Sequence, residues 1–315
     1  MDLIGIFRIL SICLLSVATI LNAAILQYFI PASGKRRFNG YFFFIINMAV
    51  ADLLTCLTRI TILSSFMATD VRVGEIACRW SEIPFAFCDV SLFMLLGMSF
   101  DRYRKITKPL GKQINRKIGT VLCIFFYAFA FSTHCQYLTE EVYIFFPESR
   151  ICAENTSRVK NAIVTLIAVI VFAVSLPIVL IIWFNVSTLR CLKKVKLFEE
   201  NANSVGNDRM ARLEYKRNLT AAKTLRMLMI LAIVTNFVPR VLTTICFVVF
   251  TTVSIPNLEK QEWLPVFFQT SCDLIFASCA INFFVYLKFV KGFRAFFVSR
   301  GRRGMSCRSQ STINH

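Results

Sequence analysis

The chain has 315 residues, of which 56% are hydrophobic and only 17% charged, whereas a soluble domain carries about a quarter charged residues. Its net charge is +18, but the cations lie between long apolar blocks and do not alternate with aromatic residues, which argues against a nucleic-acid-binding protein. The 12 cysteines contain no CxxC spacing, so they do not predict a metal site.

Seven apolar blocks follow one another along the chain, and several exceed about 18 residues, enough to cross roughly 30 Å of hydrocarbon. Backbone polar groups inside hydrocarbon must be hydrogen-bonded internally, so each block is predicted to be a transmembrane helix. The predicted spans are residues 4–30, 41–68, 82–100, 118–137, 162–189, 219–253 and 264–287. We therefore predict an all-α membrane protein, with one seven-helix domain over residues 1–298 and a basic cytosolic tail over residues 299–315.

Lysines and arginines gather in alternate separators, and this bias predicts the orientation. Residues 31–40, 101–117 and 190–218 and the tail hold most of the cations, whereas residues 69–81, 138–161 and 254–263 are mixed or acidic. We expect a multi-pass protein of the plasma membrane with an extracellular N-terminus and a cytosolic C-terminus. The sequon at Asn155 lies in an outer separator and is a predicted glycosylation site.

Polar side chains inside a span are costly, so each is a candidate functional residue. Five of them lie midway or toward the cytosolic half of spans one, two, three and seven: Asn22, Asp52, Ser91, Ser278 and Asn282. We expect them to line one hydrated cavity, in which a proton or a sodium ion balances the carboxylate of Asp52. The alternative is a neutral, hydrogen-bonded Asp52 that only ties the helices together.

Asp101, Arg102 and Tyr103 follow the third span at its cytosolic end. An aspartate beside an arginine can hold that arginine in a local ion pair, and the released arginine would point into the space between the spans. This reading predicts a two-state element. Alternatively, Arg102 is an interfacial residue that extends its charge into water.

Several motifs occur in order between Asn22 and Phe297 and together resemble rhodopsin-like (class A) G-protein-coupled receptors. Residues 47–53 are similar to the NLAxADL motif, and residues 101–110 resemble the DRYxxIxxPL signature. Residues 282–286 resemble NPxxY, with Phe283 in place of proline, and Pro177 and Pro239 match two kink prolines. Residues 288–298 resemble the amphipathic eighth helix of that family.

The resemblance implies a receptor that binds an extracellular ligand and activates a heterotrimeric G protein. The implied activation residues are Asp101, Arg102, Tyr103, Phe237, Pro239, Asn282 and Tyr286. The implied sodium pocket consists of Asp52, Ser91, Ser278 and Asn282. The resemblance also implies a disulfide between Cys78 and Cys152, for which Cys135 is a competing partner. Asn185 replaces the tyrosine that is expected to stabilise the freed arginine, so the details of activation and any sodium effect stay open.

The ligand is less constrained than the fold. A monoamine receptor is disfavoured because Pro84 stands where the amine-binding aspartate is expected. An opsin is disfavoured because the seventh span contains no lysine to bind retinal. A glycoprotein-hormone receptor is disfavoured because we expect no large N-terminal domain. The candidate pocket residues are the charged groups in the outer half of the bundle: Arg59, Asp89, Arg240 and Asp273. Two buried arginines suit an anionic group, such as that of a nucleotide, lipid or carboxylate. Arg59 with Asp89 and Arg240 with Asp273 could equally form internal ion pairs that need no ligand. A peptide is favoured narrowly, because peptide receptors are common in the family.

Further partners follow from the cytosolic sequence. The basic residues 190–226 suit anionic lipid, and serines in the tail are candidate phosphorylation sites for arrestin binding. Cys307 is a candidate for palmitoylation. A channel or transporter would instead show polar stripes through whole spans or duplicated halves, and the sequence shows neither. An enzyme would need clustered metal-binding or acid–base residues, but His134 and His315 are far apart, so we expect no enzymatic activity and no cofactor except a sodium ion.

Overall fold

The structure is a computed structural model. It describes residues 3–34, 39–67, 70–107, 114–139, 143–146, 151–154, 167, 169–202, 209–253 and 263–297.

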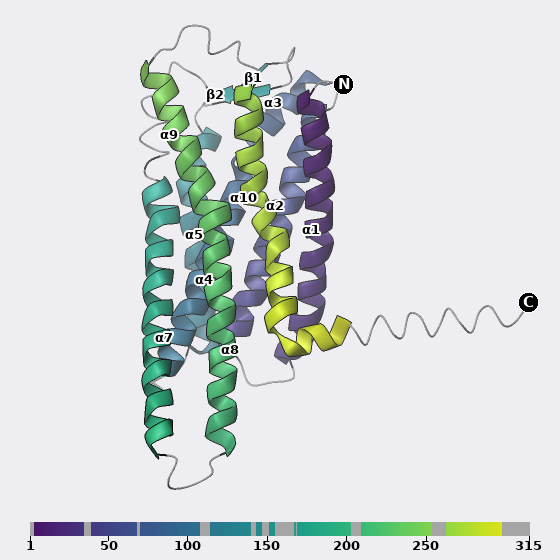
Figure 1. The fold of residues 1–315 in the computed structure, drawn as a ribbon. Helices are drawn as coiled ribbons and strands as arrows, with labels where there is room; N and C mark the ends of the chain where they lie inside the picture. Colours follow the sequence, from purple (N-terminus) through teal and green to yellow (C-terminus); the bar gives the residue numbers. More distant parts are fainter. Residues whose placement is uncertain are drawn as a thin grey trace, which may run out of the picture.

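Long helices packed side by side make up most of the described part of the chain (Figure 1). The long helices are α1 (Leu3–Gly34), α2 (Gly40–Met67), α4 (Ile83–Thr107), α5 (Arg116–Thr139), α7 (Leu176–Ala202), α8 (Arg209–Ala232), α9 (Val238–Val253) and α10 (Trp263–Phe289). A short helix, α3 (Val71–Arg79), lies between α2 and α4 in the sequence. Within the described ranges, seven helical segments are long and apolar enough to cross a membrane. The predicted all-α seven-helix bundle is therefore confirmed.

Two of the long helices contain a stretch of π-helix, which is wider than an α-helix, directly before a proline. The turn η2 (Val169–Ser175) leads into α7, where Pro177 is the second residue, and η3 (Ile233–Phe237) leads into α9, where Pro239 is the second residue. Proline lacks an N–H and crowds the carbonyl four residues earlier, so the helix locally widens. The two predicted kink positions are therefore places where the regular hydrogen-bond ladder changes.

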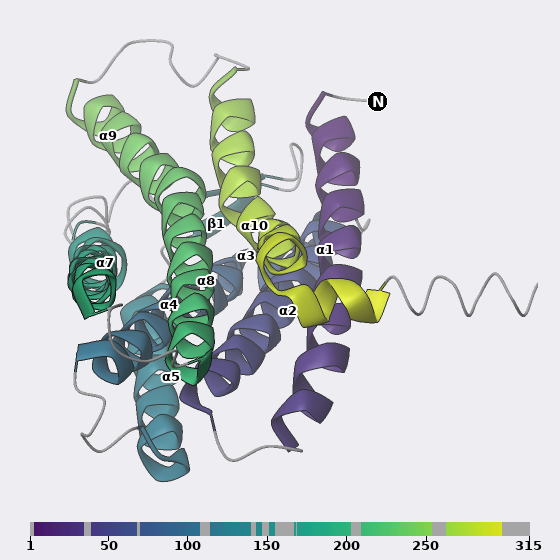
Figure 2. The same cartoon turned by 60° about the horizontal axis from the view of Figure 1, so that its bottom comes forward.

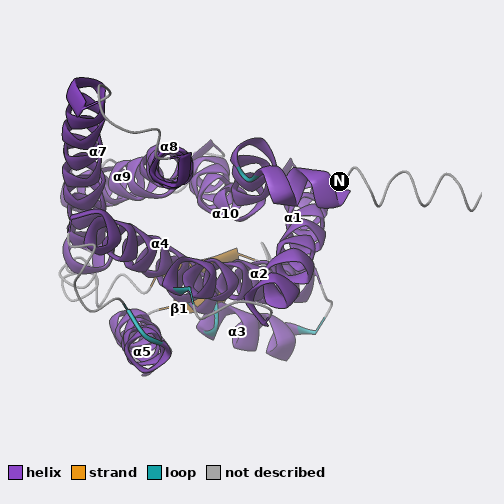
Figure 3. Ribbon diagram, turned by 90° about the horizontal axis from the view of Figure 1, so that it is seen from below, coloured by secondary structure: helices purple, strands orange, loops and turns teal. Residues whose placement is uncertain are grey.

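The helix α4 lies within the bundle and packs against α2, α5, α7 and α8, as the view along the bundle shows (Figure 3). Its approach to α2 depends on Gly97, because a Cβ atom there would lie 2.7 Å from a ring carbon of Phe44. On the outer surface of the bundle, large apolar side chains such as Ile20, Val121 and Val179 are 60–69% exposed. Such a surface suits hydrocarbon and not water.

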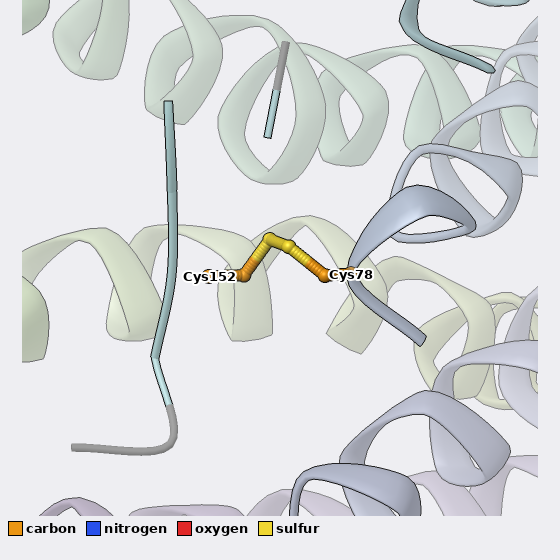
Figure 4. Close-up of a disulfide and its surroundings, with 2 residues drawn as sticks. All are labelled: Cys78 and Cys152. Atoms are coloured by element: carbon orange, nitrogen blue, oxygen red, sulfur yellow. A yellow bond between two sulfur atoms is a disulfide. The ribbon is translucent and has the colours of Figure 1, made fainter. Parts of the chain in front are cut away.

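A β-hairpin lies at the same end of the bundle as α3 (Figure 1). The strands β1 (Tyr143–Phe146) and β2 (Ile151–Glu154) pair antiparallel, with Phe145 opposite Cys152. A disulfide joins Cys152 to Cys78 of α3, with the two Cα atoms 5.5 Å apart (Figure 4). The pair implied by the resemblance is thus present, and it ties the hairpin to the segment between α2 and α4.

A short helix over residues 291–297 turns away from the end of α10 (Figure 2). Its Phe293 is fully buried and packs on the rings of Tyr28 and Phe29 from α1 and on Phe283 from α10. Gly292 lets the backbone approach Tyr28, since a Cβ there would meet the phenol oxygen. The predicted amphipathic eighth helix therefore docks against the ends of the first and last long helices.

Candidate functional site

A network of charges, called the outer network below, crosses the half of the bundle that bears the β-hairpin and is predicted to be extracellular. Asp89 is fully buried on α4, and its Oδ1 lies 2.6 Å from Nη1 of Arg240 on α9. Its Oδ2 lies 3.0 Å from Nε2 of His134 on α5, and Nδ1 of His134 lies 3.1 Å from Oε2 of Glu82. Glu82 and Asp89 are two helical turns apart and so face the same side. The network links α4, α5 and α9.

Two of the pairings considered from the sequence are wrong. Arg240 pairs with Asp89 and not with Asp273, and Arg59 does not pair with Asp89. Asp273 instead accepts a hydrogen bond of 2.6 Å from Oγ of Ser11 on α1. Sequence spacing could not select among these partners, because the rotation of each helix about its axis decides which charges face each other.

An aromatic pair lies between the two arginines. The guanidinium of Arg59 stands 5.2 Å from the ring centroid of Phe276, and that of Arg240 stands 5.8 Å from that of Phe85. The two rings are 5.0 Å apart. Both arginines are buried, and Nε of Arg59 and Nε and Nη2 of Arg240 lack hydrogen-bond partners within the described structure. These N–H groups are therefore buried donors whose hydrogen-bonding capacity is not met by the described residues.

Sequence reasoning missed Glu82 and His134 as members of this site. In the sequence, His134 is far from the other histidine and so indicates neither a metal site nor an acid–base site. It is nonetheless a polar group 5% exposed near the end of a predicted span. The rule that marks intramembrane polar residues as functional candidates, applied to the fourth span, would have identified it.

A second polar site surrounds Asp52, deeper in the bundle. Nδ2 of Asn282 donates to Oδ2 of Asp52 over 2.8 Å, and Ser91, Ser278 and Asn282 line one small cavity. Asn22 ties α1 to this region by donating to the backbone oxygen of Cys279 over 2.9 Å. Oδ1 of Asp52 is buried without a hydrogen-bond partner within the described structure. The residues singled out from the sequence thus do converge.

A cavity of about 30 Å³ lies beside this site, which is room for a water molecule or a small ion. Its polar lining comes from α4, η3 and α10: Cys88, Ser91, Asn236, Ser278 and Asn282. Asn236 also donates to the sulfur of Cys88 over 3.2 Å, which links η3 to α4. Phe237 is the last residue of η3, so this cavity adjoins the segment that was predicted to act as a switch.

At the C-terminal end of α4, which the charge bias predicts to be cytosolic, the contacts differ from the local ion pair expected there. Asp101 pairs with Lys105 over 2.7 Å, and Lys105 also donates to Oδ1 of Asn39 over 3.0 Å. The guanidinium of Arg102 stands 4.2 Å from the ring centroid of Tyr41 on α2. The predicted Asp101–Arg102 pair is therefore wrong for this structure, because Lys105, four residues further along the helix, faces Asp101 and takes its carboxylate.

Two further predicted switch residues are held by aromatic packing. Tyr103 lies against the rings of Trp183 and Phe184 on α7, at centroid distances of 5.5 and 5.2 Å. Tyr286 is fully buried beside Phe29, and its hydroxyl has no hydrogen-bond partner within the described ranges. Asn185, which stands where a tyrosine was expected, donates to the backbone oxygen of Ile181 over 2.9 Å and approaches Ser99 at 3.4 Å.

Asn155, Cys307 and the tail over residues 299–315 lie outside the described residues. Glycosylation, palmitoylation and phosphorylation at these positions stay predictions.

The seven-helix bundle, its disulfide-tethered hairpin and its buried polar sites define a membrane receptor of the seven-helix type. The model of the family "7 transmembrane receptor (rhodopsin family)" matches residues 22–286. The chain belongs to this family. Its fold and family are those of receptors and not of enzymes.

Comparisons with individual proteins agree on the fold and overlap less in sequence. The crystal structure of squid rhodopsin superposes with a TM-score of 0.73 at 15% identity, covering 96% of this chain and 85% of that one. The muscarinic acetylcholine receptor gar-2 of Caenorhabditis elegans is 29% identical over 35% of this chain and 18% of its own length. The octopamine receptor Oamb of Drosophila melanogaster is 36% identical over 22% of this chain and 11% of its own length. The matched part thus spans less than a fifth of either relative.

Proposed function

We propose that this protein is a G-protein-coupled receptor of the plasma membrane, with its N-terminus outside and its C-terminus in the cytosol. The outer charged network would form part of the ligand site, and the cytosolic end of α4 would contact a heterotrimeric G protein. The family and the burial of Arg102 at that end of α4 support this proposal.

The test is agonist-stimulated nucleotide exchange on a co-expressed G protein. Arg102→Ala should abolish exchange, whereas the control Arg104→Ala, two residues further along the same helix, should retain it. Ion flux that needs no G protein would instead favour a seven-helix channel. Tags at the two termini, probed on intact cells, would test the orientation.

We propose a small anionic ligand, such as a carboxylate or phosphate. The observation that carries this proposal is the set of buried N–H groups on Arg59 and Arg240 that lack hydrogen-bond partners. A buried guanidinium binds an anionic oxygen through charge-assisted, bidentate hydrogen bonds. Asp89 is already paired with Arg240 and hydrogen-bonded to His134, so it offers little to a cationic amine.

Screening carboxylates and phosphates for activation would test the ligand class. Replacing Arg59 or Arg240 by Gln should weaken the potency of an active anion by roughly ten-fold or more, since a hydrogen bond to a charged group contributes about 1.5–3 kcal/mol. Asp273→Asn, in the same half of the bundle, is the matched control and should change potency less. Unchanged potency in both arginine variants would reject the anion site.

A peptide is the second candidate, and one observation favours it. The hairpin β1–β2 is held at the outer end of the bundle by the Cys78–Cys152 disulfide and offers backbone edges to an extended chain. Activation by peptides that persists in the Arg59→Gln and Arg240→Gln variants would support this candidate over the small anion.

We also propose that the Asp52 site binds a sodium ion. The residues present fit a hard cation, because Oδ1 of Asp52 is buried without a hydrogen-bond partner and the side chains of Ser91 and Ser278 line the adjoining cavity. Exchanging sodium chloride for choline chloride should then shift agonist affinity, and Asp52→Asn should remove that shift. Equal sensitivity in both proteins would reject the site.

A further inference from the structure

The short helix α3 is not part of either polar site. It begins after the N-cap Asp70, whose side chain accepts a hydrogen bond from the backbone N–H of Arg72. Ala77 and Cys78 pack on Ile62 and Phe66 of α2. Seen from below, α3 lies on the side of α2 that faces away from the centre of the bundle (Figure 3). Its remaining surface therefore faces outward.

Three faces run along this helix. Gly74, Ala77 and Cys78 are buried against the bundle. Arg72, Glu75 and Arg79 are exposed and share a second face, because residues three and four apart lie above one another. The third face follows the same spacing and is apolar: Val73 is 37% exposed, Ile76 60% and Trp80, directly after the helix, 53%.

An exposed apolar face next to a charged face is typical of a helix that lies in a membrane–water interface. The helix α3 is three residues from the end of α2, whose last residue, Met67, is 40% exposed and apolar. The apolar face therefore follows closely in sequence on an exposed apolar residue at the end of a spanning helix. Tryptophan favours the headgroup level, and arginine reaches from there toward phosphates.

We propose that α3 lies in the interface of the bilayer, with Val73, Ile76 and Trp80 inserted below the phospholipid headgroups. Arg72 and Arg79 contact headgroup phosphates. Because Cys78 on the buried face of α3 is bonded to Cys152 of β2, lipid contact at α3 also anchors the outer hairpin. The position of the hairpin over the bundle thereby becomes linked to the membrane itself.

The test uses the fluorescence of Trp80 in the whole receptor, placed singly in nanodiscs of phosphatidylcholine. Trp183→Phe and Trp263→Phe leave Trp80 as the sole tryptophan. A matched receptor that keeps only Trp183, which is 54% exposed on the spanning helix α7, serves as the positive control for lipid contact. The fluorescence of each protein is measured in phospholipids whose acyl chains are brominated either near the headgroup or near the terminal methyl, and separately with iodide in the buffer.

We expect blue-shifted Trp80 emission. Lipid brominated near the headgroup should quench it about as strongly as it quenches the Trp183 control, and more strongly than lipid brominated near the end of the acyl chain. Ile76→Ser should shift the emission to the red and reduce this quenching, whereas Glu75→Ser should not. Trp80 that is quenched by iodide and indifferent to bromine would overturn the proposal. So would blue-shifted emission that appears only when two receptors share a disc, because that result assigns the face to a second copy.

Discussion

Asp89 is the residue whose replacement most directly tests the outer network. Its carboxylate is 0% exposed and lies 2.6 Å from Arg240 and 3.0 Å from His134. Asp89→Asn keeps the shape but removes the negative charge, so both neighbours lose their charged partner. Removing one member of a buried ion pair costs about 3–5 kcal/mol, mostly because the other charge stays buried and unpaired. We expect Asp89→Asn to destabilise the receptor by about 3 kcal/mol, since asparagine can still accept one hydrogen bond.

A double-mutant cycle separates this pair from general damage. Arg240→Gln alone should cost a similar amount, but the double variant should be about 1–3 kcal/mol more stable than the sum of the two changes, as for residues in direct contact. The measurement is the free energy of unfolding by denaturant in mixed lipid–detergent micelles. Asp70→Asn is the control, because asparagine caps a helix as well as aspartate and should change stability by less than about 0.5 kcal/mol. Additive losses would refute the coupling between α4 and α9.

Three other changes test separate parts of the structure. Gly97→Ala should cost about 1–3 kcal/mol of unfolding free energy, because the new methyl would meet Phe44, and adding Phe44→Leu should restore part of it. Cys152→Ser should lower the free energy of unfolding by about 2–5 kcal/mol, because it removes the disulfide. Cys78→Ser should lower it by the same amount, and the double variant should be no less stable than either. A larger loss in the double variant would mean that the two side chains contribute separately. Lys105→Met removes the partner of Asp101, which then becomes available to Arg102. Agonist-independent nucleotide exchange should therefore fall about five-fold, the effect of a coupling near 1 kcal/mol, and an increase would contradict this reasoning.

The bundle was predictable because long apolar runs leave the chain few alternatives. Hydropathy predicts which residues lie in the membrane, however, and not where each helix begins and ends. The helix α8 begins at Arg209, ten residues before the predicted span over 219–253, because a helix can continue into water where backbone groups are still paired internally. The helix α3 was not predicted because its composition is mixed. The spacing of Val73, Ile76 and Trp80 was the signal that would have identified it.

The sites were predictable only in part, for two physical reasons. Intramembrane polarity identified Asp52, Asp89 and Arg240 one by one, since each is costly to bury without a partner. It could not pair them, because pairing depends on how the helices are rotated and how far each is shifted along its axis. The Asp101–Lys105 pair was different, since it follows from four-residue spacing on one helix and could have been inferred from the sequence.

Arg240 connects the outer network to the predicted switch, because it directly follows Pro239 and lies three residues after Phe237 at the end of η3. An anionic ligand and Asp89 would compete for the same guanidinium. The two network variants should therefore move ligand potency in opposite directions. Arg240→Gln removes the donor and should lower the potency of an active anion, whereas Asp89→Asn removes the competitor and should raise it by about five-fold or more, at equal surface expression. If both variants lowered potency alike, Asp89 would be part of the binding surface and not a rival of the ligand, and the ion pair between α4 and α9 would not be the contact that the ligand breaks.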